Sequence, residues 1–225
     1  YSGTLLSSLA GIWSHTPLPE SYVLSHYASA LENEAGRFVN TLVYCGFAAI
    51  ADVLAGLVMA RAIDALPARW HRWLTWAATG LLGVPGVALA IAYLQFFQGA
   101  HLPFTQIPLD APWFLLSMAF SIRGLPFALR SCAFALQQLP PPYLEAAHMS
   151  GASRPVSLWR VMLPMLRLSL LAAFLICFGV AAMDLSSAML LVPSETDAPL
   201  SYAVYLHMQT ATGRGTGAAL VVLIL

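Results

Sequence analysis

The amino-acid sequence predicts an all-α membrane protein, a polytopic helical bundle of about 5–6 transmembrane helices with one further helix in a cytoplasmic loop. Of its 225 residues, 59% are hydrophobic and 9% are charged, which leaves too little polar surface to cover a soluble globule. Several apolar stretches approach the roughly 20 residues that cross a hydrocarbon core. Ten arginines balance ten acidic residues, and a net charge of zero gives no reason to expect a nucleic-acid partner.

The predicted crossings are separated by polar or proline-containing segments. The complete crossings are residues 39–63, 74–97, 112–133 and 168–192, and the partial ones are residues 1–14 and 215–225. Gly83, Pro85 and Gly86 predict a kink in the second complete crossing, because they interrupt the helical hydrogen-bond pattern. Since the chain starts with Tyr1 and stops about halfway through an apolar run, we expect a fragment of a longer polypeptide that forms a single transmembrane domain over residues 1–225.

The arginines predict the orientation of the chain, because basic residues concentrate in loops on the cytoplasmic side of a membrane. Seven of them flank, occupy or border two loops of the same side: Arg61, Arg69, Arg72, Arg130, Arg154, Arg160 and Arg167. Only Arg37 and Arg214 belong to the opposite side. Residues 134–167 are therefore predicted to face the cytoplasm, and residues 98–111 and 193–213 to face outward.

The cytoplasmic segment 134–167 contains a spaced motif. Its members are Glu145, Ala146, Ala147, Gly151, Val161, Leu163 and Pro164. The motif resembles the EAA loop of type I (MetI-like) permease subunits of ABC importers, which reads E-A-A, three residues, G, nine residues, I, one residue, L-P. Every spacing agrees, and the one departure is Val161 in place of isoleucine. The alternative is an ordinary amphipathic turn between two crossings.

The residues of this loop also suit a short, rigid helix. Prolines precede Glu145, and a proline at the first helical position loses no intrahelical hydrogen bond. Gly151 can end the helix, Ala146 and Ala147 keep one surface slim enough to enter a groove on a partner, and Pro164 suits the first turn of the next crossing. We predict a coupling helix that carries a rigid-body motion between a cytoplasmic partner and the membrane helices.

The resemblance implies a set of partners and a location. ATPase subunits that bind ATP and Mg would close the cytoplasmic face, a periplasmic or lipid-anchored binding protein would deliver the substrate, and a second permease half or copy would complete the pathway. The chain would be a multi-pass protein in contact with lipid of a bacterial inner membrane. It is not expected to be an enzyme or to hold a cofactor, since a phosphate-binding G-x-x-x-x-G-K-[ST] loop needs a lysine and the chain has none.

The resemblance also narrows the range of candidate substrates. Residues 85–94, 123–130 and 197–202 are similar to the ferric-iron type of permease, in which two halves are often fused, and this chain resembles the second half. The predicted function is to provide the pathway for a small solute, with ferric iron as the first candidate. Close relatives of that type handle phosphonates, sugar phosphates, thiamine and polyamines, so these substrates stay open.

Three charged residues lie well away from the ends of the predicted crossings. Arg123 lies near the middle of its helix, Asp52 at a comparable depth, and Asp184 nearer the outer end of its crossing. Because charges in a bilayer are costly, such residues usually line a pathway or find a charged partner. Arg123 is predicted either to gate or attract an anion, or to form a structural ion pair with one of the two aspartates.

Two other classes of protein fit parts of the sequence. An intramembrane enzyme would need paired catalytic groups, for which Asp52 and Asp184 are the candidates, but neither lies in a protease motif. An ion-driven carrier or channel would also explain Arg123 and the broken crossing. No metal site is predicted, because the histidines lack ligand spacing, and the three cysteines are expected to be buried apolar side chains.

Overall fold

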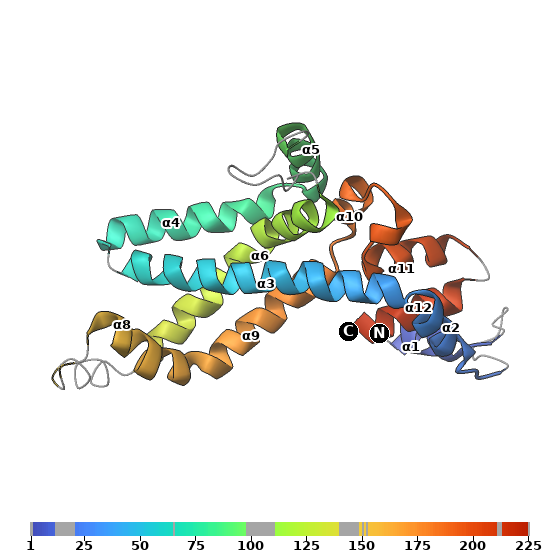
Figure 1. Cartoon of the computed structure of the whole chain (residues 1–225), viewed down its shortest axis with the longest axis horizontal. Helices are drawn as coiled ribbons and strands as arrows, with labels where there is room; N and C mark the ends of the chain where they lie inside the picture. Colours follow the sequence, from blue (N-terminus) through green and yellow to red (C-terminus); the bar gives the residue numbers. More distant parts are fainter. Residues whose placement is uncertain are drawn as a thin grey trace. The chain divides into compact units, whose positions relative to one another are not determined.

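Helices form almost all of the structure that the computed structural model describes, which covers residues 2–11, 21–64, 66–97, 111–139, 149, 151, 153–210 and 213–224. The helices are α1 (Ser2–Leu9), α2 (Ser25–Asn33), α3 (Ala35–Asp64), α4 (Ala68–Gly80), α5 (Gly86–Phe97), α6 (Pro112–Gln137), α8 (Arg154–Ser157), α9 (Leu163–Ala182), α10 (Leu185–Leu191), α11 (Leu200–Gln209) and α12 (Arg214–Ile224) (Figure 1). Short turns of other helix types are η1 (Leu81–Gly83), η2 (Leu158–Met162) and η3 (Glu195–Asp197). Within these ranges no strand is formed, and the prediction of an all-α fold is confirmed.

Among the described residues, three helices are long and apolar enough to cross a membrane. They are Ala35–Asp64, Pro112–Gln137 and Leu158–Ala182. The first two lie over the predicted crossings 39–63 and 112–133. The third begins earlier than the predicted crossing 168–192. It also ends earlier, because the helix stops at Ala182 and the separate helix α10 starts after Asp184.

The kink predicted near Pro85 is a complete break. Helix α4 ends at Gly80, a single turn follows, and α5 begins at Gly86. The Pro85 carbonyl accepts from the backbone N–H groups of Ala88 and Leu89 at 3.0 and 3.2 Å. Pro85 therefore stands just before α5, where its missing N–H costs nothing. The segment predicted as one crossing, 74–97, consists of two shorter helices.

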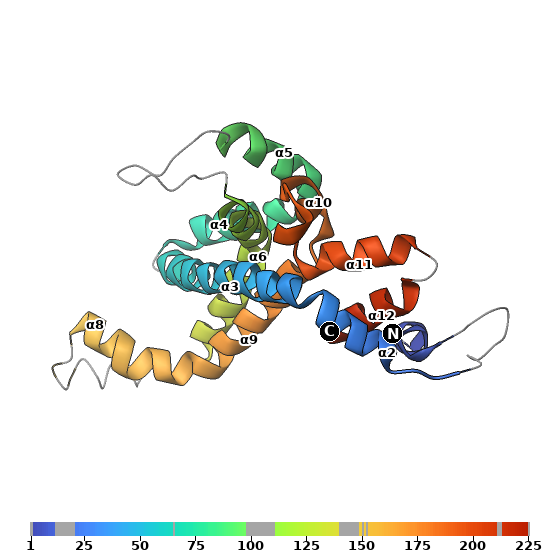
Figure 2. The ribbon, with the colours of Figure 1, turned by 45° about the vertical axis from the view of Figure 1, so that its right-hand side comes forward.

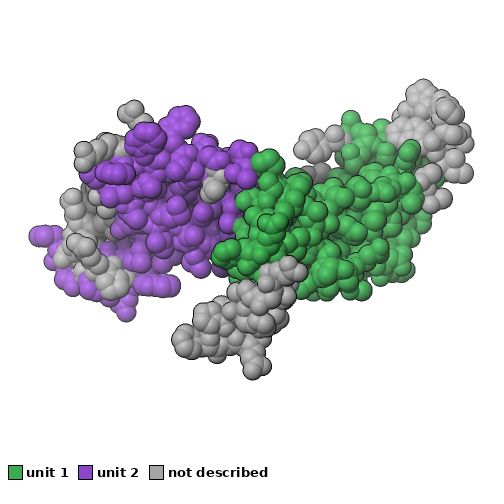
Figure 3. All heavy atoms as spheres, turned by 90° about the horizontal axis from the view of Figure 1, so that it is seen from above, with its two compact units in different colours: residues 1–46, 85–120, 182–225 green, residues 47–84, 121–181 purple. Residues whose placement is uncertain are grey.

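The chain forms two compact units (Figure 3). Unit 1 comprises residues 1–46, 85–120 and 182–225, and unit 2 comprises residues 47–84 and 121–181. Helices α3 and α6 each supply residues to both. The expected single domain over residues 1–225 stays a prediction.

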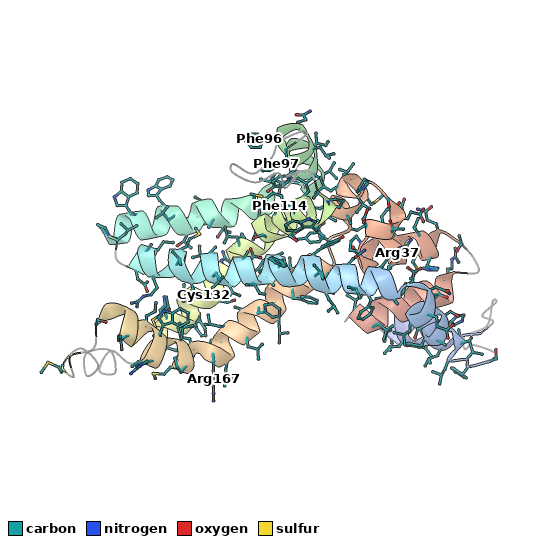
Figure 4. The ribbon with its side chains drawn as sticks, in the orientation of Figure 1. Arg37, Phe96, Phe97, Phe114, Cys132 and Arg167 are labelled. Atoms are coloured by element: carbon teal, nitrogen blue, oxygen red, sulfur yellow. The ribbon has the colours of Figure 1, made fainter. Side chains whose placement is uncertain are left out.

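Unit 1 packs around helix α12, which α1, α2 and α11 contact (Figures 1 and 2). Its main apolar cluster joins Ala30 of α2, Leu200 and Ala203 of α11, and Leu220 of α12. Separately, the Phe97 ring at the end of α5 meets Phe96 and Phe114 edge to face, with ring centroids 5.0 and 6.1 Å apart (Figure 4). These rings attach the end of α5 to the start of α6.

Unit 2 has a core of small and aliphatic side chains from α3, α4, α6 and the helical run into α9. Members include Ala60 and Ile63 of α3, Ala78 of α4, Leu136 of α6 and Leu166 of α9. Small residues let membrane helices approach closely. A methyl group on Gly56 of α3 would lie 2.9 Å from backbone of α6. As predicted, the cysteines are buried, and Cys132 lies in this core (Figure 4).

Candidate functional site

The predicted coupling loop is described only in part. Glu145, Ala146 and Ala147 lie outside the described residues. Met149 is helical, and Gly151 is exposed with a φ of 80°. Glycine adopts this left-handed conformation without a steric penalty, and it is the conformation that commonly follows the last turn of a helix.

The second half of the motif lies in a continuous helical run from Arg154 to Ala182. Val161 belongs to the π-helical turn η2, in which the Leu163 backbone N–H donates to the Leu158 carbonyl five residues earlier. Pro164 follows in the first turn of α9, as expected, but the chain is already helical before it. Such a wide turn suits a proline, which lacks the N–H of an ordinary i→i−4 hydrogen bond.

Asp52 of α3 lies against one face of α6. Its side chain is 1% exposed, and its Oδ1 accepts a hydrogen bond from the Ser121 hydroxyl at 2.6 Å. Three residues further along α6, Gly124 leaves the space for this carboxylate, since a methyl group there would collide with Asp52 Oδ2. Arg123 lies between them on α6 and is half-buried. The structure therefore brings Ser121 and Gly124 to Asp52.

Sequence reasoning identified Asp52 and Arg123 but missed Ser121 and Gly124. The available signal was the pair of small residues that flank Arg123 at a spacing of three, a spacing at which small residues face the same neighbouring helix. Pathway roles for Asp52 and Arg123 stay predictions.

Asp184 caps the N-terminus of α10 in unit 1. Its Oδ1 accepts from the Ser187 backbone N–H at 3.3 Å, and its Oδ2 accepts from the Ser187 hydroxyl at 2.8 Å. The Ser201 hydroxyl of α11 donates to the Asp184 carbonyl at 3.5 Å. Aspartate is among the preferred capping residues because its side chain satisfies a free N–H of the first turn. This structural role accounts for an acidic side chain at this position, and a pathway role stays a prediction.

A cavity of about 490 Å³ lies beside this cap within unit 1. Its walls come from Ala182, Met183 and Leu185, from α11 and from α12, and include Met208 and Val221. Ser201 and Tyr205 are its hydroxyl-bearing residues. The cavity is of the size of a small-ligand site, with a mainly apolar lining.

A cluster of charged residues joins the start of α3 to α11 and η3. Glu34 accepts from Arg37 Nη1 at 2.8 Å and pairs with His207 Nε2 at 2.9 Å. Arg37 also donates to the Glu195 carbonyl at 3.2 Å and reaches its carboxylate at 3.4 Å (Figure 4). Asn40 donates to the Thr196 carbonyl at 2.8 Å. Sequence reasoning placed Arg37 and residues 193–213 on the outer side but did not predict that Arg37 and Glu195 meet.

Glu34→Gln is expected to destabilise unit 1 by about 2–3 kcal/mol, because a mostly buried carboxylate would lose its charge-assisted bonds to Arg37 and His207. The melting temperature of the purified protein would report the change. Glu32→Gln is the matched control, since Glu32 lies two residues earlier and is exposed. Equal melting temperatures for the two variants would contradict a stabilising role for the cluster.

Comparison with known proteins relates the chain to transport proteins. Residues 52–225 match the family model described as "Binding-protein-dependent transport system inner membrane component". The chain is 25% identical to the ferric transport system permease protein FbpB of Actinobacillus pleuropneumoniae over 164 residues, which cover 73% of this chain and 23% of that protein. It is 32% identical to the sulfate transport system permease protein CysT of Salmonella typhimurium over 96 residues, which cover 42% of this chain and 35% of that protein.

A solved structure shares the fold. A chain in the crystal structure of a bacterial alginate ABC transporter, in complex with a periplasmic protein bound to alginate pentasaccharide, superposes with a TM-score of 0.63. The match is 16% identical and covers 88% of this chain and 76% of the other. The chain spans about a quarter of the length of the ferric transport relatives, 23% and 24% for two of them.

Proposed function

Because the chain belongs to the family of binding-protein-dependent transport system inner membrane components, we propose that it forms a permease part of an ATP-driven importer. The observation that carries this proposal is the family match over residues 52–225, which includes Asp52, Arg123 and the whole of the loop 134–167. Three apolar helices of spanning length support a translocation pathway built from α3, α6 and α9.

In this proposal the coupling loop docks on a partner ATPase, which binds ATP and Mg. The helical run from Arg154 to Ala182 begins within the segment 134–167 and ends in α9, and its 29 residues would extend about 43 Å at the rise of an α-helix. A displacement at the loop would therefore move a long, rigid element. The chain itself contributes no nucleotide-binding motif, so ATP hydrolysis is assigned to the partner.

The proposed substrate is ferric iron delivered by a periplasmic binding protein. Similarity to ferric transport permeases supports it. An oxyanion is the second candidate, because the sulfate permease CysT is also similar and because the planar guanidinium of Arg123 suits a phosphonate or sugar phosphate. Thiamine and polyamines complete the set of alternatives.

Transport assays in proteoliposomes test the proposal. The full-length permease would be reconstituted with its ATPase and its binding protein, and the accumulation of radioactive ferric iron would be compared with that of sulfate and a phosphonate. We expect iron uptake that requires ATP and stops when the ATPase is omitted. Uptake that continues without the ATPase would overturn the proposal in favour of a channel or ion-driven carrier.

Arg123→Gln separates the two substrate classes. For an oxyanion, we expect the half-saturation concentration for uptake to rise about tenfold or more, because a charge-assisted pair is lost. For ferric iron we expect no rise, since a guanidinium repels a cation. Arg214→Gln is the control, because this exposed arginine lies at the start of α12, outside the predicted middle of a crossing. A rise for iron uptake would contradict the assignment of iron as a free cation near Arg123.

A further inference from the structure

Helix α11 has two different faces within unit 1. Leu200 and Ala203 are buried in the apolar cluster that joins α11 to α2 and α12. The cavity of about 490 Å³ is lined by a second set of α11 residues, which are Ser201, Val204, Tyr205 and Met208. These four positions follow the i, i+3, i+4, i+7 spacing of a single helical face. One complete face of α11 therefore borders the cavity, while the other packs into the core.

The remaining walls of the cavity come from α12 and from the junction between α9 and α10. Val221 and Ile224 lie about one turn apart on α12, and the junction supplies Ala182, Met183 and Leu185. Helix α11 packs on both α12 and α10 (Figures 1 and 2). Every lining residue belongs to unit 1, so the cavity is formed inside one compact unit.

The residues that line the cavity include no charged side chain. An ion in such surroundings would lose its hydration and gain no compensating charge. Ferric iron, oxyanions, thiamine and polyamines all carry charge, so the cavity does not suit any of the candidate substrates. It is therefore a site separate from the one that the proposed transport function requires.

Water is also a poor occupant of this cavity. A buried water molecule needs roughly two to four polar partners. The Ser201 hydroxyl already donates to the Asp184 carbonyl at 3.5 Å. Tyr205 is the other hydroxyl-bearing residue of the lining, and within the part of the chain that the structure describes its hydroxyl has no hydrogen-bond partner. Since an empty cavity leaves its lining atoms without dispersion contacts, an apolar ligand with one hydrogen-bonding group suits this lining best.

The most exposed lining residues of the cavity are methionines. Met183 is 58% exposed and Met208 is 40% exposed, whereas Ser201 is 9% exposed. Methionine side chains are flexible and adapt to the shape of a ligand. Because the chain belongs to a family of inner membrane components, such an exposed apolar rim borders lipid tails, which are as apolar as the rim itself. Met208 lies in the segment 193–213, which is predicted to face outward, so the rim belongs to the outer leaflet.

We propose that this cavity binds one acyl chain of an outer-leaflet phospholipid. The acyl chain lies along the face of α11 that borders the cavity, and the Tyr205 hydroxyl donates to the ester carbonyl. An ester is neutral, whereas the carboxylate of a free fatty acid would find no cation in the lining. The proposal rests on the membrane location and the predicted orientation of the chain, and it does not depend on the substrate or on the ATPase.

Photocrosslinking of the full-length protein tests the proposal. The protein is purified with a phosphatidylglycerol that carries a diazirine on one acyl chain, washed with unlabelled phosphatidylglycerol, and irradiated. Mass spectrometry compares the label on α11 and α12 with the label on Leu168, Leu171 and Leu175, which are exposed apolar residues of α9. We expect α11 and α12 to keep their label after the wash and α9 to lose it. Equal label on the two regions would overturn the proposal, whether or not any variant folds.

Val221→Phe should lower the retained label about tenfold, because its ring takes the space of at least two methylene groups of the ligand. Val222→Phe is the matched control, since Val222 is the next residue of α12, is likewise half-buried and does not line the cavity. It should leave the label unchanged. Equal label in the two variants would contradict the proposed position of the acyl chain.

Two further comparisons test the chemistry of the ligand. Tyr205→Phe should lower the retained phospholipid label about fivefold, the effect of one lost hydrogen bond. A free fatty acid with the same diazirine should label α11 and α12 less than the phospholipid does. Stronger labelling by the fatty acid would overturn the assignment of a phospholipid. Transport is not measured, so the outcome is independent of the proposed function.

Discussion

Gly124→Val is expected to disrupt the packing of α3 against α6 and to lower the yield of folded protein. The new side chain would occupy the position of Asp52 Oδ2. Either the two helices separate, or the carboxylate leaves the Ser121 hydroxyl that binds it at 2.6 Å. Overpacking costs about 1–3 kcal/mol, and a buried polar group without its partner costs about 1–3 kcal/mol more. Thermal stability in detergent, followed by retention of the monodisperse peak, measures the loss.

Gly179→Val in α9 is the control, because a side chain added there meets nothing within 4 Å. We expect this variant to melt close to the unmodified protein. A double-mutant cycle adds a second check: Gly124→Ala combined with Asp52→Ala should cost less than the sum of the single changes, because the second substitution removes the colliding carboxylate. Additive costs would show that Gly124 and Asp52 do not share one space.

Gly151→Val is expected to uncouple the proposed importer. The φ of 80° at this position is disfavoured for a residue with a side chain by about 1–2 kcal/mol, and more for a β-branched one. The end of the coupling helix would change direction and lose its fit to the ATPase. We expect transport to fall about tenfold, the loss that 1.4 kcal/mol of strain at the loop would produce. ATP hydrolysis by the partner and substrate capture by the binding protein should continue.

The ratio of substrate transported to ATP hydrolysed is the measurement. Gly151→Asn is the matched control, because asparagine tolerates the left-handed conformation, and it should retain most of the coupling. Glu145→Ala should reproduce the uncoupling if this residue binds the ATPase as the motif predicts. Normal coupling in Gly151→Val would remove the loop from the proposed mechanism.

Several elements of the fold were predictable because their causes are local. The long apolar runs of α3 and α6 mark them as helices of spanning length, and Pro85 marks the break before α5. The break at Asp184 was missed, since residues 168–192 read as one apolar stretch. The local signal there was an aspartate three residues before Ser187, the spacing of an N-cap bond. The N-cap at Asp184 starts a new helix within a segment that its average hydropathy predicts to be one crossing.

The tryptophans of α4, which are Trp70, Trp73 and Trp76, were predictable only in part. Their spacing of three residues is visible in the sequence and predicts a common face of a helix. The direction of that face was not predictable, because it depends on which residue of α4 packs on the core. Ala78, buried against residues of α3 and α6, decides that the indoles point outward.

The sequence by itself determined that this protein belongs in a membrane. It also predicts which side the long loop 134–167 faces, and it contains the motif that resembles the EAA loop of importer permeases. These properties follow from the transfer free energy of individual residues, from loop charges and from residue spacing, which are all local. The tertiary structure alone decided that Asp52 meets Ser121, 69 residues away, and that Glu34 meets His207, 173 residues away. Such pairs depend on how the helices pack, and Asp52 can approach α6 because Gly124 leaves room for its carboxylate.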